Sequence, residues 1–271
     1  MSRARRVWPL ALLLAVSPAS QLAAQSADAT DADAAAGGIL DRLEARIESG
    51  ATDGVADAIE RWLAGARNPP RDQLGRARYL RARLMSDADA ARDELLALAL
   101  DGGSDWATRA WLRLGQLELA AGDPVRAEAA LERLRADDPR SAAARSSWYW
   151  TARSFEDRGM LERACEGWAR ALAEAQNTGD ARSVRLAVTA SAGCAPGLPR
   201  FEAQVAAFSA AEGANDMRSQ LEADGFPARV VEADGLHRVR VGLFSTAEAA
   251  RGVERRLRLA GFSVSVVPAV P

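Results

Sequence analysis

The last part of the chain, about seventy residues, repeats itself at a constant offset, and this duplication constrains the fold more than any other feature. In each half, an alternating apolar run precedes a helical apolar stripe, and a second alternating run follows it. Seven residues recur 36 positions later: Val205, Phe208, Ser209, Ala214, Leu221, Gly225 and Phe226 return as Val241, Phe244, Ser245, Ala250, Leu257, Gly261 and Phe262. The sequence therefore predicts a small α+β domain in βαββαβ order, with a four-stranded antiparallel sheet.

Both helices of this domain are expected to cover the same face of the sheet. Each carries one apolar stripe, which consists of Ala214, Met217 and Leu221 in the first and of Ala250, Val253 and Leu257 in the second. Ser-x-x-Glu patterns at Ser209 and Ser245 resemble capping boxes, in which the two side chains satisfy free amides of the first turn. We expect the helices to begin at these serines and to leave the other sheet face uncovered.

Strand alternation predicts which side chains lie on the uncovered face. If Ala203, Val205, Val239 and Val241 point to the helices, then Gln204, Leu236, Arg238 and Arg240 point away. Amide and guanidinium groups can hydrogen-bond the hydroxyl and acetamido groups of a sugar chain, and apolar atoms can cover its ring faces. The alternative is a solvated strand face, on which the arginines pair with cross-strand acids such as Glu202 and Glu232.

The segments FEAQVAAFS, LHRVRVGLFST and AGFSVSVV resemble the SPOR (sporulation-related repeat) family, from about Arg200 to Val267. The resemblance implies a βαββαβ fold that binds peptidoglycan glycan strands lacking their stem peptides, as occurs at division septa. Gln204 and Arg238 match two residues of the family pattern. Leu236 and His237 stand where an aromatic often precedes that Arg, and Ala207 stands where a small polar residue can occur. We therefore expect glycan contacts from Gln204, Arg238, Leu236, Arg240 and Ala207.

Residues 39–195 have the pattern of an all-α helical-hairpin solenoid, because amphipathic segments alternate there with Gly, Pro or Asp breaks. One unit resembles the tetratricopeptide repeat at Trp111, Leu114, Gly115, Gly122, Ala127, Leu131 and Pro139. A second unit follows with Trp148, Ala152, Phe155, Gly159, Ala164, Trp168 and Ala171 in matching places. We expect three to four hairpins, capped by a helix near 183–192, whose groove docks an unidentified protein or peptide.

The N-terminus has the features of a secretory signal. Arg3, Arg5 and Arg6 precede a short apolar run, and small residues at Ala23 and Ala24 offer a cleavage site. The sequence predicts a signal peptide at 1–24, a flexible spacer at 25–38, and export to the periplasm or cell envelope without a stable membrane span after cleavage. An uncleaved N-terminal anchor is the alternative, although the apolar run is shorter than the roughly 20 residues of a membrane helix.

Charge argues against nucleic acid as the partner of the C-terminal domain. From Arg200 onward the chain balances nine Arg against nine Asp and Glu, whereas a partner of polyanions needs a basic surface. The whole chain has a formal net charge of −2, which becomes about −5 by counting once the three arginines of the signal are removed. The mature protein is therefore mildly acidic.

The two cysteines, Cys165 and Cys194, are expected to form a disulfide in an oxidising compartment; two unlinked apolar residues are the alternative. His237 is the only histidine, and it falls on the helix-facing positions of its strand. No metal site, cofactor or catalytic constellation is therefore expected. The sequence predicts a non-enzymatic protein that binds glycan at residues 199–271 and a protein partner at 39–195; the alternative is a protein-interaction scaffold without glycan affinity.

Overall fold

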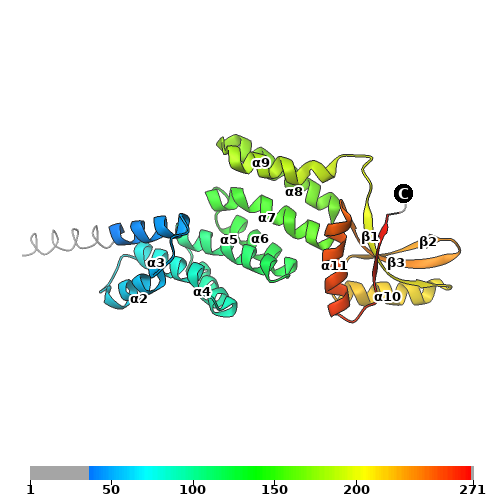
Figure 1. The fold of residues 1–271 in the computed structure, drawn as a ribbon, viewed down its shortest axis with the longest axis horizontal. Helices are drawn as coiled ribbons and strands as arrows, with labels where there is room; N and C mark the ends of the chain where they lie inside the picture. The colour runs from blue at the N-terminus through cyan, green and yellow to red at the C-terminus, as the bar shows by residue number, and fades with distance from the viewer. Residues whose placement is uncertain (1–36, 270–271) are drawn as a thin grey trace, which may run out of the picture. The chain divides into compact units, whose positions relative to one another are not determined.

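The computed structural model describes residues 37–269 (Figure 1). The expected signal peptide at 1–24 and nearly all of the spacer at 25–38 lie outside the described residues. The chain divides into two compact units, with the division between Arg81 and Ala82. Within the described part, no helix is both long and apolar enough to cross a bilayer.

The first unit contains a helix at 37–48, α2 (Val55–Gly65) and most of α3 (Arg71–Leu84). Val55 and Ile59 lie one turn apart on α2 and are fully buried. Arg76 of α3 donates to Glu44 of the first helix, with 2.9 Å between Nε and Oε2, so an ion pair joins these two helices across the unit.

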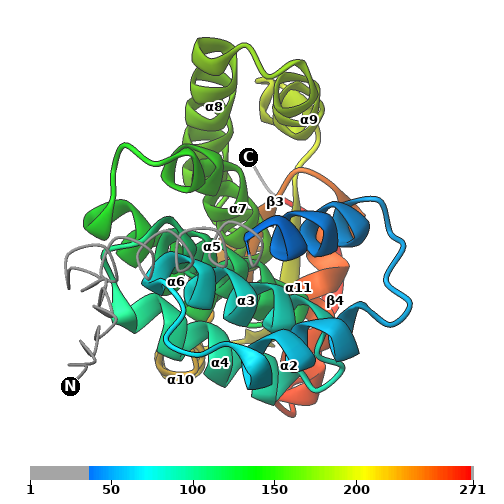
Figure 2. The ribbon, with the colours of Figure 1, turned by 90° about the vertical axis from the view of Figure 1, so that its left-hand side faces the viewer.

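The helical part of the second unit comprises α4 (Ala88–Asp101), α5 (Asp105–Ala120), α6 (Pro124–Asp137), α7 (Ala142–Arg158), α8 (Leu161–Thr178) and α9 (Ala181–Ser191). Neighbours in sequence pack against each other, and α5 also contacts α7, as expected of stacked hairpins. Figure 2 shows α9 beside α8, where it covers the last hairpin. The predicted helical repeats are confirmed.

Small residues let the helices of each hairpin approach closely. A Cβ atom on Gly115 would lie 2.6 Å from a methyl carbon of Leu131 on α6, and one on Gly167 would lie 2.8 Å from the Cβ of Ala152 on α7. Between α5 and α6, the turn ends at Asp123, whose carboxylate accepts the Arg126 N–H at 2.9 Å. The spacing of glycines and caps in the sequence thus sets where each hairpin turns.

A disulfide joins Cys165 on α8 to Cys194, with Cα atoms 5.6 Å apart. Cys194 belongs to the short 3₁₀ turn Ala192–Cys194, which follows α9. It packs beside a buried cluster of Ala152, Phe155, Ala164 and Trp168 from the last hairpin. The bond therefore fixes the end of the capping helix to that hairpin.

The C-terminal part of the second unit consists of β1 (Phe201–Phe208), α10 (Ala211–Ala223), β2 (Ala228–Ala233), β3 (Leu236–Phe244), α11 (Ala247–Leu259) and β4 (Ser265–Pro268). The strands form one antiparallel sheet in the order β2-β3-β1-β4. Ala203, Val239 and Val241 of the sheet are buried together with Ala214 and Leu221 of α10 and with Ala250, Val253 and Leu257 of α11. The predicted βαββαβ fold is confirmed, with both helices on one face.

The expected capping boxes are wrong in detail. Helix α11 begins after Thr246, whose hydroxyl accepts the Ala249 N–H at 3.1 Å, and α10 begins after Ala210 without a side-chain cap. Each helix thus starts one residue later than expected, with Ala210 and Thr246 in place of Ser209 and Ser245 at the N-cap.

The sheet domain contacts the last hairpin through the turn between α7 and α8. The Leu243 N–H donates to the Gly159 carbonyl at 2.7 Å, and Arg256 of α11 donates to the carbonyl of Asp157. Gly159 and Gly242 both have positive φ, and a side chain on either would collide with Phe244. The expected division near 195–199 therefore falls inside a single compact unit.

Candidate functional site: the helix-free face of the C-terminal sheet

Two irregularities determine which residues share the helix-free face. Register shifts occur in β1 beside Glu202 and beside Val205, and Gly242 of β3 has a φ of 67°. Residues directly opposite each other in an antiparallel pair lie on the same face. The shift at Val205 therefore places Ala206 opposite buried Val239, and Ala207 opposite Arg238 on the uncovered face.

The uncovered face consists of cross-strand rows. One row runs through all four strands as Ser265, Gln204, Arg240 and Arg229. The next row contains Ala207, Arg238 and Val231, and alternation along β3 places Leu236 beyond it. All five residues expected to bind glycan therefore lie on one face of the sheet.

Gln204 and Arg238 leave polar groups available on this face. The Gln204 side chain is half-buried and makes no hydrogen bond within residues 37–269. Arg238 donates to Asp234 with 3.0 Å between Nη2 and Oδ2, and Asp234 retains 85 % of its side-chain exposure. An exposed carboxylate binds a guanidinium weakly because water competes for both groups. A ligand can therefore reach the Gln204 amide and compete for Arg238.

Arg240 lies on this face but is not exposed as expected. Its residue exposure is 5 %, and its Nη1 donates to Glu202 Oε2 at 2.8 Å and to the Pro268 carbonyl at 3.1 Å. Direct ligand contact by Arg240 does not fit this burial, because its guanidinium is already used to compensate a buried carboxylate. Strand parity alone could not show this, since it gives the direction of a side chain and not its partners.

Arg229 was not among the expected residues, although it occupies the same row as Gln204. Its Nε donates to Glu202 Oε1 at 2.8 Å, and its Nη2 donates to the same oxygen. The Glu202 side chain is fully buried, whereas that of Arg229 is 53 % exposed. Arg229 and Val230 are neighbours in the segment ARVVE, so strand alternation points their side chains to opposite faces. Val230 packs on the helix side, and Arg229 therefore lies on the uncovered face.

His237 lies opposite Phe208 and Glu232, and Phe208 packs against the domain core. In residues 37–269 there is no group of three or more His, Cys, Asp or Glu that could hold a metal ion. The uncovered face is polar, because Gln204, Arg229 and Arg238 lie on it.

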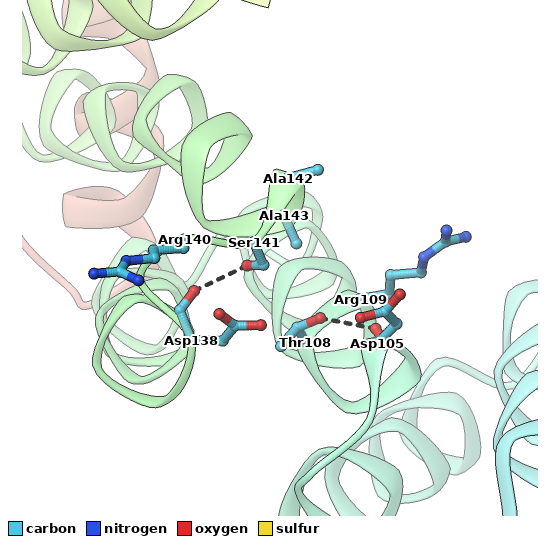
Figure 3. A pocket seen from close by; sticks show the side chains of 8 residues that line it. All are labelled: Asp105, Thr108, Arg109, Asp138, Arg140, Ser141, Ala142 and Ala143. Carbon is cyan, nitrogen blue, oxygen red and sulfur yellow. Dashed lines mark hydrogen bonds between the residues drawn. The ribbon is translucent and has the colours of Figure 1, made fainter.

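The helical repeats contain a second candidate, a pocket of about 250 Å³ at the start of α5 and α7 (Figure 3). Its lining includes Asp105, Thr108, Asp138 and Ser141. Thr108 donates to the Asp105 carbonyl at 2.8 Å, and Ser141 donates to the Asp138 carbonyl at 2.9 Å, as Figure 3 shows. Both hydroxyls are thus already used as donors within their own helix ends.

Two family models match separate parts of this chain. Residues 199–268 match the SPOR domain model, and residues 109–141 match a tetratricopeptide repeat model. The C-terminal region is thus a SPOR domain, and one of the helical hairpins that precede it matches the tetratricopeptide repeat. The solution structure of the peptidoglycan binding domain of the B. subtilis cell wall lytic enzyme CwlC is 30 % identical, covers 28 % of this chain and 96 % of its own, and has a TM-score of 0.27. A search of curated proteins found no significant match.

Proposed function

We propose that this chain is a non-enzymatic cell-envelope protein that binds peptidoglycan glycan strands through its SPOR domain and a protein partner through its helical repeats. The observation that carries the proposal is the SPOR match at residues 199–268, on a sheet whose uncovered face is polar. On this view the binding domain extends over residues 199–271 and the repeat domain over 39–195.

The chemistry of the uncovered face supports a sugar ligand. The Gln204 amide can both donate and accept, so it suits hydroxyl and acetamido groups. Arg238 adds N–H donors, and Leu236 and Ala207 supply apolar atoms against which a sugar ring can lie. The ligand we propose is denuded glycan, as the resemblance to the SPOR family implies.

Export is part of the proposal, since peptidoglycan lies outside the cytoplasm. The signal peptide proposed at residues 1–24 would deliver the chain to the envelope, and enrichment at the division septum would follow where amidases expose bare glycan. The Cys165–Cys194 disulfide fits this location because disulfides persist in oxidising compartments.

The test is co-sedimentation of the full chain with purified sacculi, before and after an amidase removes the stem peptides. We expect the chain to sediment with sacculi and to bind more after amidase treatment. An equal failure to sediment with both would refute glycan binding and would favour the alternative, a protein-interaction scaffold whose SPOR domain has lost its ligand.

A further inference from the structure

The Glu202 carboxylate is fully buried on the face of the sheet that no helix covers. A buried carboxylate is costly unless paired and hydrogen-bonded. Here Arg240 satisfies one oxygen and Arg229 the other. The two arginines differ in exposure, because 6 % of the Arg240 side chain and 53 % of the Arg229 side chain remain accessible. Arg240 thus serves to compensate the buried Glu202 carboxylate. Arg229 is the arginine of this ion-paired group that a ligand can reach.

The hydrogen bonds of Arg229 leave one edge of its guanidinium unused. Nε and Nη2 both donate to Glu202 Oε1, and Nη1 has no partner within the described residues. A guanidinium can therefore hold Glu202 along one edge and present Nη1 and Nη2 to a second planar acceptor. Because Glu202 restrains the group before a ligand arrives, little further ordering is needed on binding.

The charges of this face indicate which acceptor would bind. Arg229, Arg238 and Arg240 stand against Glu202 and Asp234, so the described face carries one positive charge in excess. A denuded glycan strand is anionic, because removal of the stem peptide frees the lactyl carboxylate of each muramic residue. A guanidinium edge and a carboxylate match in charge and planar geometry.

We propose that Arg229, positioned by Glu202, contacts the glycan strand and binds a free lactyl carboxylate. This inference rests on the glycan binding proposed above and adds to it a residue and a chemical group. It also supplies a reason for preferring denuded glycan, since an amide-linked lactyl group has no charge.

The experiment measures the affinity of the full chain for soluble, amidase-denuded glycan strands. The same strands, with their carboxylates converted to neutral amides by a carbodiimide and methylamine, serve as the second ligand. We expect the parent chain to bind the free-acid strands about tenfold more tightly, as the loss of one charge-assisted contact implies. Arg229→Ala should bind both strands equally, and Arg229→Lys should recover part of the preference.

The ratio of the two affinities keeps the test independent of folding, because an unfolded fraction lowers both affinities together. Arg255→Ala is the matched control: it removes the same charge from an exposed site on α11, on the helix side of the sheet, and should keep the preference. If the parent binds glycan but Arg229→Ala keeps its preference, this inference is overturned and the proposed function stands. If the parent binds neither strand, both are overturned.

Discussion

The two faces of the SPOR sheet use alternate residues of the same strands, yet each is stabilised differently. On the covered face, Val239 and Val241 are fully buried beneath α10 and α11, so apolar contact stabilises them. On the uncovered face, Glu202 is equally buried but is enclosed by the side chains of Arg229 and Arg240. Burial on that side thus depends on charge pairing within one layer, which leaves neighbouring polar groups free for a ligand.

The largest effect should come from placing a charge on the covered face. Val239→Asp puts an unpaired carboxylate between sheet and helices, and we expect a loss of about 4 kcal/mol or more, enough to unfold the SPOR domain. Hydrogen exchange of the β3 amides in the full chain would show this as lost protection.

Val231→Asp is the matched control, because Val231 lies on the uncovered face opposite Arg238. There the new carboxylate meets water and a guanidinium, so the loss of stability should be about 1 kcal/mol. Equal loss of protection in the two variants would show that the faces do not differ as described.

The next largest effect should come from the buried ion pair on the uncovered face. Glu202→Ala leaves the guanidinium of Arg240 buried without its carboxylate, and we expect about 3 kcal/mol of destabilisation. Glu232→Ala on β2 removes an exposed carboxylate and should change stability by less than about 0.5 kcal/mol. Chemical denaturation of the full chain, followed by hydrogen exchange of the β3 amides, measures the loss of stability in both variants. Similar losses would show that the buried and the exposed acid do not differ.

A smaller effect is expected at the sheet edge, where the domain contacts the repeats. Burial raises the pKa of Glu156 and of Asp157, and it outweighs the lowering by Arg153. At neutral pH, folding therefore keeps a partly desolvated carboxylate charged. Because the pKa of Glu156 is higher in the folded state, lowering the pH protonates the folded state first. The unfavourable contribution to stability therefore disappears as the pH falls toward the pKa of a glutamate in the unfolded chain, about 4.3.

Glu156→Gln should therefore raise the stability at pH 7 by less than about 1 kcal/mol, and the gain should vanish near pH 4. Glu162→Gln on α8 is the control, since Glu162 is exposed. Thermal unfolding of each variant from pH 4 to 7 would decide this; a gain that grows as the pH falls would contradict the assigned sign.

Much of this architecture could be predicted because it depends on local patterns. The 36-residue offset aligns two strand-helix-strand units, and small residues such as Gly115 mark close helix contacts. The placement of Gln204 and Arg238 on the uncovered face follows from strand alternation. These features require only that side chains alternate along strands and recur every turn of a helix.

The remainder depends on contacts between distant segments. The shift at Val205 returns Ala207 to the uncovered face, and simple alternation would have placed Ala207 beneath the helices. Gly242, an isolated glycine within a strand pattern, was a usable sign of irregularity. The pairing of Glu202 with Arg229, 27 residues away, requires the sheet order, so sequence alternation could not separate supporting Arg240 from exposed Arg229.

The smallest effect on stability, and a large one on binding, is expected at the two matched residues of the family pattern. Gln204→Ala removes a side chain without a hydrogen bond in the described structure, and Arg238→Ala breaks only the pair with exposed Asp234. Each should change stability by less than about 0.5 kcal/mol, because exposed pairs contribute little. Each should nevertheless weaken sacculus binding by about tenfold, since a hydrogen-bonding group that meets the ligand is lost.

Co-sedimentation with sacculi measures the binding of these variants, and denaturation of the same preparation measures their stability. Arg255→Ala should alter neither, and if Gln204→Ala and Arg238→Ala bind as well as the parent, the ligand lies elsewhere.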